Sequence, residues 1–229
     1  MTIIPVIDLK NGGAVHAKLG LRDQYLPLNT PLCASFVVEN VIEAFLQVYP
    51  FKIFYLADLN AITNSGDNAI LIETLLKNYS QITFWVDSGY QKRPSKFVDF
   101  ANCLPVLGSE CYGDNQLSAL KLFEKNFVLS LDFSAQQQPL GSPKLFEKRD
   151  FWSEKVIVMT LARVGSFAGV DIETLRYFQN LSPQTKFVAS GGIRDKADLI
   201  ALKNIGIEFA LCASALHSGK ITAVDIQTL

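Results

Sequence analysis

The fold of this chain is decided by the stretch Lys186-Phe-Val-Ala-Ser-Gly-Gly-Ile-Arg-Asp195. A short apolar run stops at two glycines and a segment of helical character follows, so the pattern predicts a strand, a tight turn and the start of a helix. Glycine lets backbone N–H groups approach an anion without a side chain in the way, and a helix N-terminus adds partial positive charge. The turn therefore favours phosphate, although a glycine pair alone is more often an ordinary turn.

Internal repetition strengthens this interpretation. Residues 86–91 repeat residues 189–194 at an offset of 103, and residues 106–110 repeat residues 211–215 at an offset of 105. Near the start of each half, residues 5–9 correspond to residues 129–133. A repeat of this length predicts one domain over residues 1–229, built from two half-barrels at about 1–124 and 125–229. The extra residues of the first half fall in a long polar loop at residues 10–31, where functional insertions are typical.

The bulk composition allows a large core and excludes several classes of partner. The 229 residues are 49% hydrophobic with a net charge of −1, so no general field attracts nucleic acid. The chain has neither a signal peptide nor an apolar run of about 18 residues, which predicts a cytoplasmic protein without a membrane partner. With two histidines and no CxxC spacing, we expect no metal site, no cofactor and free thiols at Cys33, Cys103, Cys111 and Cys212.

Eight strand–helix units are predicted along the chain. The strands are expected at residues 3–9, 52–58, 82–87, 104–107, 127–132, 156–160, 187–190 and 209–212. Helices are expected at residues 35–49, 68–79, 96–101, 115–125, 144–150, 171–180 and 195–205, and a brief hairpin at residues 14–18. Eight such units predict a (β/α)8 TIM barrel with its active site at the C-terminal ends of the strands. An open doubly wound sheet is the alternative, but the chain lacks an early GxGxxG turn.

The motifs resemble those of the HisA/HisF family, the sugar-phosphate isomerase and cyclase of histidine biosynthesis, over nearly the whole chain. The matching pieces are Ile4-Pro5-Val6-Ile7-Asp8-Leu9, Leu131-Asp132, Arg163-Val164-Gly165-Ser166, Ser190-Gly191-Gly192-Ile193-Arg194 and residues 215–221. The first loop, residues 15–28, is more similar to a HisA/HisF-related subgroup of methanogens and methylotrophs. That subgroup is associated with one-carbon cofactor metabolism.

The resemblance implies a set of site residues. It implies one catalytic aspartate in each half, Asp8 and Asp132, and two phosphate sites. The first-half phosphate site would be made by Ser88, Gly89, Gly108 and Ser109, and the second-half site by Gly191, Gly192, Ala213 and Ser214. Departures from the isomerase pattern occur at Tyr90, Gln91, Met159 and Ala213. Because Arg194 follows the second glycine turn where Gln91 follows the first, we expect the second-half site to be the tighter one.

Other polar residues could contact the substrate: Lys10, Lys18, Arg22, Asp58, Asp87, Thr160, Arg163, Ser166 and Arg194. Asp58 and Asp87 end strands, where a carboxylate can equally cap the following loop. Charges in the long first loop can equally be solvated. Lys10 would serve as a Schiff-base lysine only if it points inward and is desolvated, which strand alternation leaves open.

Two carboxylates in one barrel mouth suit an aldose–ketose (Amadori) rearrangement, with Asp8 as the base and Asp132 as the acid. Three functions follow as hypotheses. The first is an isomerase of a phosphoribosyl-type substrate, as in histidine biosynthesis. The second is a paralogue with a different reaction in methanopterin- or methanofuran-type cofactor metabolism, and the third is a non-catalytic barrel that binds a phosphorylated ligand. Paired aspartates favour the first two, and in each case the expected partner is a phosphorylated small molecule.

Overall fold

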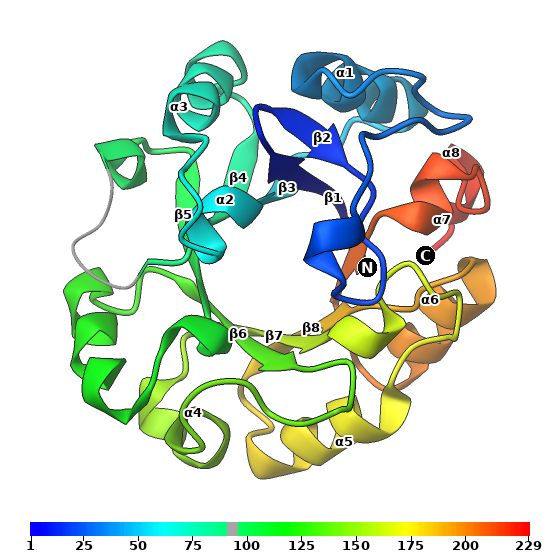
Figure 1. Ribbon diagram of the computed structural model, residues 1–229. Coiled ribbons are helices and arrows are strands. Elements are labelled where there is room, and N and C mark those ends of the chain that lie inside the picture. The colour runs from blue at the N-terminus through cyan, green and yellow to red at the C-terminus, as the bar shows by residue number, and fades with distance from the viewer. Residues whose placement is uncertain (91–95) are drawn as a thin grey trace.

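The computed structural model describes residues 1–90 and 96–229, and its centre is a closed barrel of parallel strands (Figure 1). The strands follow one another around the barrel in chain order, and β1 pairs with both β3 and β9, which closes the sheet. They are β1 (Thr2–Lys10), β3 (Ile53–Asp58), β4 (Thr83–Asp87), β5 (Cys103–Gly108), β6 (Val128–Phe133), β7 (Lys155–Thr160), β8 (Lys186–Ser190) and β9 (Phe209–Cys212). The predicted TIM barrel is confirmed, and the open sheet is wrong because neither β1 nor β9 is an edge.

The strands form where the chain is apolar, and they are buried on both faces, as parallel strands covered by helices require. Trp85 in β4 is 1% exposed, and its ring centroid lies 6.3 Å from that of Phe209. Side chains two residues apart on a strand point the same way, so Trp85 lies beneath Asp87 inside the barrel. The tryptophan therefore packs the barrel interior below the carboxylate.

α-Helices surround the barrel in Figure 1. The longer ones are α1 (Val38–Val48), α3 (Ala69–Asn78), α5 (Ile172–Leu181) and α6 (Lys196–Asn204), with α8 (Ala223–Gln227) near the C-terminus. Buried residues recur at helical spacing, as in α1 with Val38, Val41, Ile42 and Phe45. The helices predicted at 35–49, 68–79, 171–180 and 195–205 are confirmed, with boundaries shifted by a few residues. Among the described residues, none of the helices has the length and apolarity to cross a membrane.

Two of the predicted helices are 3₁₀ segments, η2 (Lys96–Asp99) and η4 (Asp114–Phe123). In η4 the buried residues are Leu117, Leu120 and Phe123, spaced three apart. A 3₁₀-helix has three residues per turn, so this spacing places all three on one face, whereas an α-helix would spread them. The helix expected at 144–150 is shorter, as α4 (Lys144–Glu147) followed by η5 (Arg149–Phe151).

Short helical turns follow several strands at the mouth of the barrel: α2 (Leu59–Ile62), η3 (Ser109–Cys111), η6 (Leu161–Arg163) and α7 (Ser214–His217). The sequence did not predict these turns as separate elements. Each begins within one or two residues of the end of its strand. The turns therefore determine which backbone N–H groups face the mouth.

The long first loop crosses the mouth. Its start, β2 (Gly13–Val15), pairs antiparallel with β1 as the hairpin pattern predicted, and η1 (Arg22–Gln24) follows. Leu19 N donates to Val164 O at 2.8 Å, which joins the loop to the connection after β7. Gly165 has φ +64°, and a Cβ there would lie 2.6 Å from Ala17 O. Glycine at this position therefore permits the contact that brings Arg22 over the mouth.

Candidate active site

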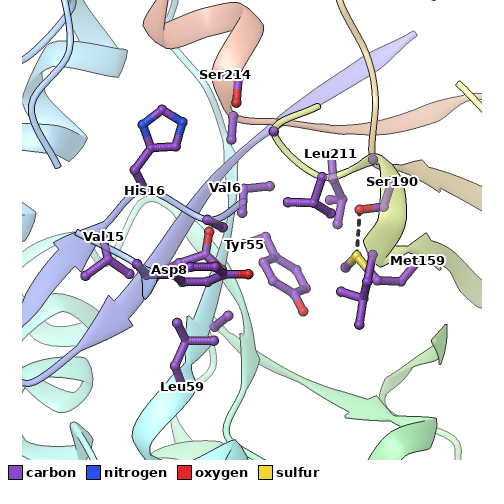
Figure 2. Close-up of a pocket in the computed structure, with 18 of the residues that line it drawn as sticks. Val6, Asp8, Val15, His16, Tyr55, Leu59, Met159, Ser190, Leu211 and Ser214 are labelled. Carbon is purple, nitrogen blue, oxygen red and sulfur yellow. Dashed lines mark hydrogen bonds between the residues drawn. The ribbon is translucent and has the colours of Figure 1, made fainter. Parts of the chain in front are cut away.

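One cavity of about 110 Å³ opens at the C-terminal ends of the strands, where the barrel pattern predicted the active site. Figure 2 shows Asp8 from β1, Tyr55 from β3 and Met159 from β7 facing the same space, with Ser214 at its rim. Much of the lining is apolar, and Ser190 Oγ donates to Met159 Sδ at 3.1 Å. Polar chemistry in the cavity is therefore concentrated in a few side chains.

Three aspartates line this cavity, Asp8, Asp87 and Asp132. Burial raises the pKa of Asp8 to about 7, against the opposing effect of the Arg22 charge. Burial, together with the negative charge of Glu110, raises the pKa of Asp87 to about 7 and that of Asp132 to about 8. Near neutral pH the cavity thus holds carboxyl groups in both protonation states, which is the condition for acid–base chemistry.

Hydrogen bonds fix two of these carboxyl groups. Asp132 accepts from Ser130 Oγ at 2.6 Å and from Ser109 Oγ at 3.3 Å, and its own N–H donates to Ser109 Oγ at 2.9 Å. Asp87 accepts from the Tyr55 hydroxyl at 3.2 Å.

Within the described residues, no three His, Cys, Asp or Glu side chains are grouped so as to hold a metal ion.

The glycine turn after β4 does not face the cavity. Neither Ser88 nor Gly89 lines it. The N–H of Gly89 donates to Asp87 Oδ1 at 3.2 Å, and a Cβ on Gly89 would lie 2.9 Å from Ile62 Cα in α2. The short helix α2 therefore packs directly on this turn, and the turn serves its own strand-end carboxylate.

The turn after β5 also binds a carboxylate of the protein. The N–H of Glu110 donates to Asp132 Oδ2 at 3.2 Å, and Ser109 is fully buried. A Cβ on Gly108 would lie 3.1 Å from Asp132 Oδ2 and 3.3 Å from Asp87 Oδ2. The four residues predicted for the first-half phosphate site thus surround carboxylates of the protein and do not form an open anion site.

The corresponding residues of the second half do line the cavity: Gly191, Gly192, Ala213 and Ser214. The two glycines have φ +96° and +82°. Ala213 has φ −117°, an ordinary value for a residue with a Cβ, which explains why alanine is accepted at this turn. Among the hydrogen bonds of the described residues, none uses the N–H of Gly192 or Ser214. Donors for an anion are therefore available in this half.

Comparison with known proteins identifies the family. The model of a family described as "Histidine biosynthesis protein" matches residues 2–222. This chain belongs to that family.

The relatives of this chain include an uncharacterized protein and named isomerases. An uncharacterized protein of Methanocaldococcus jannaschii is 34% identical over 99% of this chain and 97% of its own length. Two relatives are named 1-(5-phosphoribosyl)-5-((5-phosphoribosylamino)methylideneamino) imidazole-4-carboxamide isomerase. That of Methanosphaera stadtmanae is 25% identical over 98% of both chains, and that of Albidiferax ferrireducens is 27% identical over 96% of this chain and 94% of its own. The full-length coverage shows that the whole barrel is shared.

Several of the predicted substrate contacts lie outside the cavity. Asp58 accepts from Asn68 N and Asn68 Nδ2, both at 2.7 Å, and from Ala61 N at 3.2 Å, so it caps the β3–α3 connection. Lys10 Nζ donates to the Arg22 carbonyl at 2.8 Å and does not line the cavity. The Schiff-base hypothesis for Lys10 therefore loses its geometric basis. Lys18 also lies outside the lining.

On the second-half side, four further predicted contacts have structural roles. Arg194 forms a bidentate pair with Asp198, at 2.9 and 2.7 Å, one turn along α6, and does not reach the cavity. Arg163 Nη1 donates to Gly169 O at 3.0 Å, and Ser166 Oγ donates to Arg163 O at 2.8 Å. Thr160 is buried and also lies outside the lining. Arg194 therefore does not supply the reason given for a tighter second site, and the tighter second site stays a prediction. Gln91 lies outside the described residues.

Several polar residues of the cavity were not predicted from the sequence, among them Glu110, Tyr25, Tyr55 and His217. Both carboxylate oxygens of Glu110 accept from Arg22, at 2.9 and 2.5 Å. Arg22, which was predicted to contact the substrate, therefore reaches the mouth, but its positive charge is already paired with the negative charge of Glu110. Burial lowers the pKa of His217 to about 4, which keeps this histidine neutral. The sequence held one indication that Glu110 is functional, because the equivalent position of the second half is Ala215.

The raised pKa values predict how stability depends on pH. The folded protein binds more protons than the unfolded chain between about pH 4 and 8, because Asp8, Asp87 and Asp132 titrate near 7 or 8 when folded. The three carboxyl groups contribute their full stabilisation to the folded state below about pH 4, and this contribution is lost as they ionise up to about pH 8. We expect the free energy of unfolding, measured in urea, to fall by at least about 1 kcal/mol from pH 5 to pH 8.

Asp132→Asn should flatten this fall, since the amide does not titrate. Asp150→Asn is the matched control, because Asp150 is exposed and does not line the cavity. Equal slopes for the wild type and Asp132→Asn would contradict the assignment of a raised pKa to Asp132.

Proposed function

We propose that this protein is an aldose–ketose isomerase that acts on a phosphorylated sugar, with Asp8 as the base and Asp132 as the acid. The observation that carries the proposal is that both carboxyl groups line one cavity at the C-terminal ends of the strands. The pKa of Asp132 is raised to about 8 and that of Asp8 to about 7, so between these pH values Asp132 is the more protonated of the two and Asp8 the more ionised. These are the protonation states that an acid and a base need.

The roles follow from the chemistry of an aminoaldose. Asp132 donates its proton to the ring oxygen, which opens the ring to an imine. Asp8 then removes the proton from C2, and the electron pair moves to give the enamine, which tautomerises to the aminoketose. The apolar surface around the carboxyl groups, including Met159 and Leu211, favours the neutral acid and excludes competing water.

The phosphate of the substrate is assigned to the turns at Gly191-Gly192 and Ala213-Ser214. This assignment is supported by the uncommitted N–H groups of Gly192 and Ser214 and by the absence of side chains on the two glycines. No lysine is needed, because backbone N–H groups alone can bind an anion. Anchoring one end of the substrate in this way would place its reactive carbons between the two aspartates.

A second candidate function uses the same acid–base pair on a different substrate, in a one-carbon cofactor pathway, and low identity to the named isomerases leaves room for a different substrate. Identity to the uncharacterized archaeal protein is 34%, whereas identity to the two named isomerases is 25% and 27%. The isomerase names specify a substrate with two phosphoribosyl groups. The two functions share the proton transfers and differ in the substrate.

Proton exchange in D₂O tests the shared chemistry. The protein is incubated with the imidazole-carboxamide substrate named for the relatives and, separately, with monophosphorylated aminoaldoses, and NMR follows the C2 proton. We expect the C2 proton of at least one phosphorylated aminoaldose to be replaced by deuterium, with ketose formed. Rapid turnover of the imidazole-carboxamide compound would assign the protein to the relatives' reaction. Phosphate binding without exchange in any compound would contradict the isomerase proposal and favour a binding protein.

A further inference from the structure

We infer that the substrate carries a single phosphate, held by the second half of the barrel, and that its other end presents hydroxyl or amino groups. The inference rests on the proposed function and concerns the first half of the cavity, which in a repeated barrel would hold a second phosphate. Its basis is the set of groups that already fill that position.

Three donors of the first half already bind carboxylates of the protein. Gly89 N donates to Asp87 Oδ1, and Glu110 N and Ser109 Oγ donate to Asp132 Oδ2, at distances of 3.2 to 3.3 Å. An incoming phosphate would have to displace both carboxylates from these groups. Each displaced carboxylate would then lose its hydrogen bonds while remaining buried, which is costly.

The charges of the first half also oppose a phosphate. Asp87, Asp132 and Glu110 all line this part of the cavity. The nearby cation, Arg22, binds both oxygens of Glu110 and is therefore already neutralised. A dianion here would face like charges, whereas hydroxyl or amino groups would find acceptors.

The second half differs at the equivalent positions. Ser190 stands where the first half has Asp87, and Ala215 stands where it has Glu110. Ala215 has no side-chain acceptor, and the Ser190 hydroxyl is directed to Met159 Sδ. The N–H of Gly192 stays uncommitted, while the equivalent N–H of Gly89 is bound by Asp87. The two halves are therefore complementary to different ends of one substrate.

The size of the cavity agrees with a smaller substrate. Sites for larger small molecules commonly occupy about 300 to 1,000 Å³, whereas this cavity has about 110 Å³. The first loop restricts it, because the Arg22–Glu110 pair joins that loop to the turn after β5. Two phosphoribosyl groups would require the pair to break and the loop to move.

Two matched compounds test the inference by calorimetry in phosphate-free buffer: ribose 5-phosphate and ribose 1,5-bisphosphate. We expect the monophosphate to bind one per chain and the bisphosphate to have a Kd at least about tenfold higher, because like charges oppose its second phosphate. A bisphosphate that binds as tightly as the monophosphate, or more tightly, would overturn the inference. If neither compound nor inorganic phosphate binds, the phosphate assignment of the proposed function fails, and the inference with it.

Two variants locate the effect. Ser214→Asp places a carboxylate among the second-half donors and should raise the Kd of ribose 5-phosphate at least about tenfold, because like charges repel. Ser218→Asp, at the exposed other end of α7, is the matched control and should bind ribose 5-phosphate as the wild type does.

Glu110→Ala copies Ala215 of the second half and frees Arg22, so it should narrow the difference in Kd between ribose 5-phosphate and ribose 1,5-bisphosphate. An unchanged difference in Glu110→Ala would show that the first-half carboxylates do not set the preference, which overturns the inference.

Discussion

Replacing Asp8 or Asp132 by asparagine is expected to lower kcat by about 10²- to 10⁴-fold, the usual contribution of a general acid or base. Asparagine keeps the volume of the side chain and removes the transferable proton. The Ser130 hydroxyl and the Glu110 N–H, which donate to the Asp132 carboxylate, can also hydrogen-bond to an asparagine side chain, so the barrel should remain folded. Steady-state kinetics on the substrate identified by deuterium exchange, with circular dichroism as the fold control, measures the effect.

Asp87→Asn is the matched control for these two variants. Asp87 lines the same cavity and is buried, as Asp132 is. Ser190 occupies the position of Asp87 in the repeat, and the oxygens of Asp87 accept from Tyr55 and Gly89. We expect Asp87→Asn to lose less than about tenfold in kcat, because its removal leaves the acid and the base in place. A loss in Asp87→Asn equal to that in Asp8→Asn would contradict the assignment of the base.

The pH profile separates the two roles. In the wild type kcat/KM should rise as Asp8 ionises near pH 7 and fall as Asp132 loses its proton near pH 8, which gives a narrow optimum between these values. The residual activity of Asp8→Asn should lack the acidic limb, and that of Asp132→Asn should lack the alkaline limb. A wild-type profile that is flat from pH 6 to 9 would contradict both assignments.

Sequence reasoning reached the barrel because its signals are local. Buried parallel strands read as continuous apolar runs, and helices read as apolar residues at helical spacing, so both can be recognised within a short window. The pattern failed at residues 114–123, where apolar residues three apart suit a 3₁₀-helix. It also gave no sign of the short turns that follow the strands, since these depend on what packs beside them.

The site was predicted only in part, because partners distant in sequence decide it. Asp8 and Asp132 lie in the cavity where the repeat placed them. Whether the N–H of Glu110 serves a phosphate or a carboxylate depends on Asp132, 22 residues away on the next strand. The same holds for Asp58, whose oxygens are taken by Asn68. A glycine turn therefore predicts available N–H groups, but the neighbouring strands determine which acceptor they bind.

A large stability loss is expected for Gly192→Ala. Gly192 has φ +82°, and a Cβ there would lie 2.1 Å from the carbonyl oxygen and 2.8 Å from the carbonyl carbon of Gly169. Both atoms belong to the backbone of the connection after β7, so neither can rotate away as a side chain would. The turn must shift, which we expect to cost about 3 kcal/mol or more in the free energy of unfolding and to abolish phosphate binding. Urea denaturation and calorimetry with inorganic phosphate measure the two effects.

Gly12→Ala is the matched control, because Gly12 has φ +81° and no atom within 4 Å of the position of its Cβ. It carries only the strain of a left-handed backbone, about 1 to 2 kcal/mol, so the difference between the two variants isolates the close approach to Gly169. Gly191→Ala should fall between them, since its Cβ would meet Thr160 O at 2.7 Å. The order Gly12, Gly191, Gly192 in rising cost is the expected result. Equal costs for Gly12→Ala and Gly192→Ala would mean that the turn yields freely, and a turn that yields freely could not present its N–H groups as a fixed phosphate site.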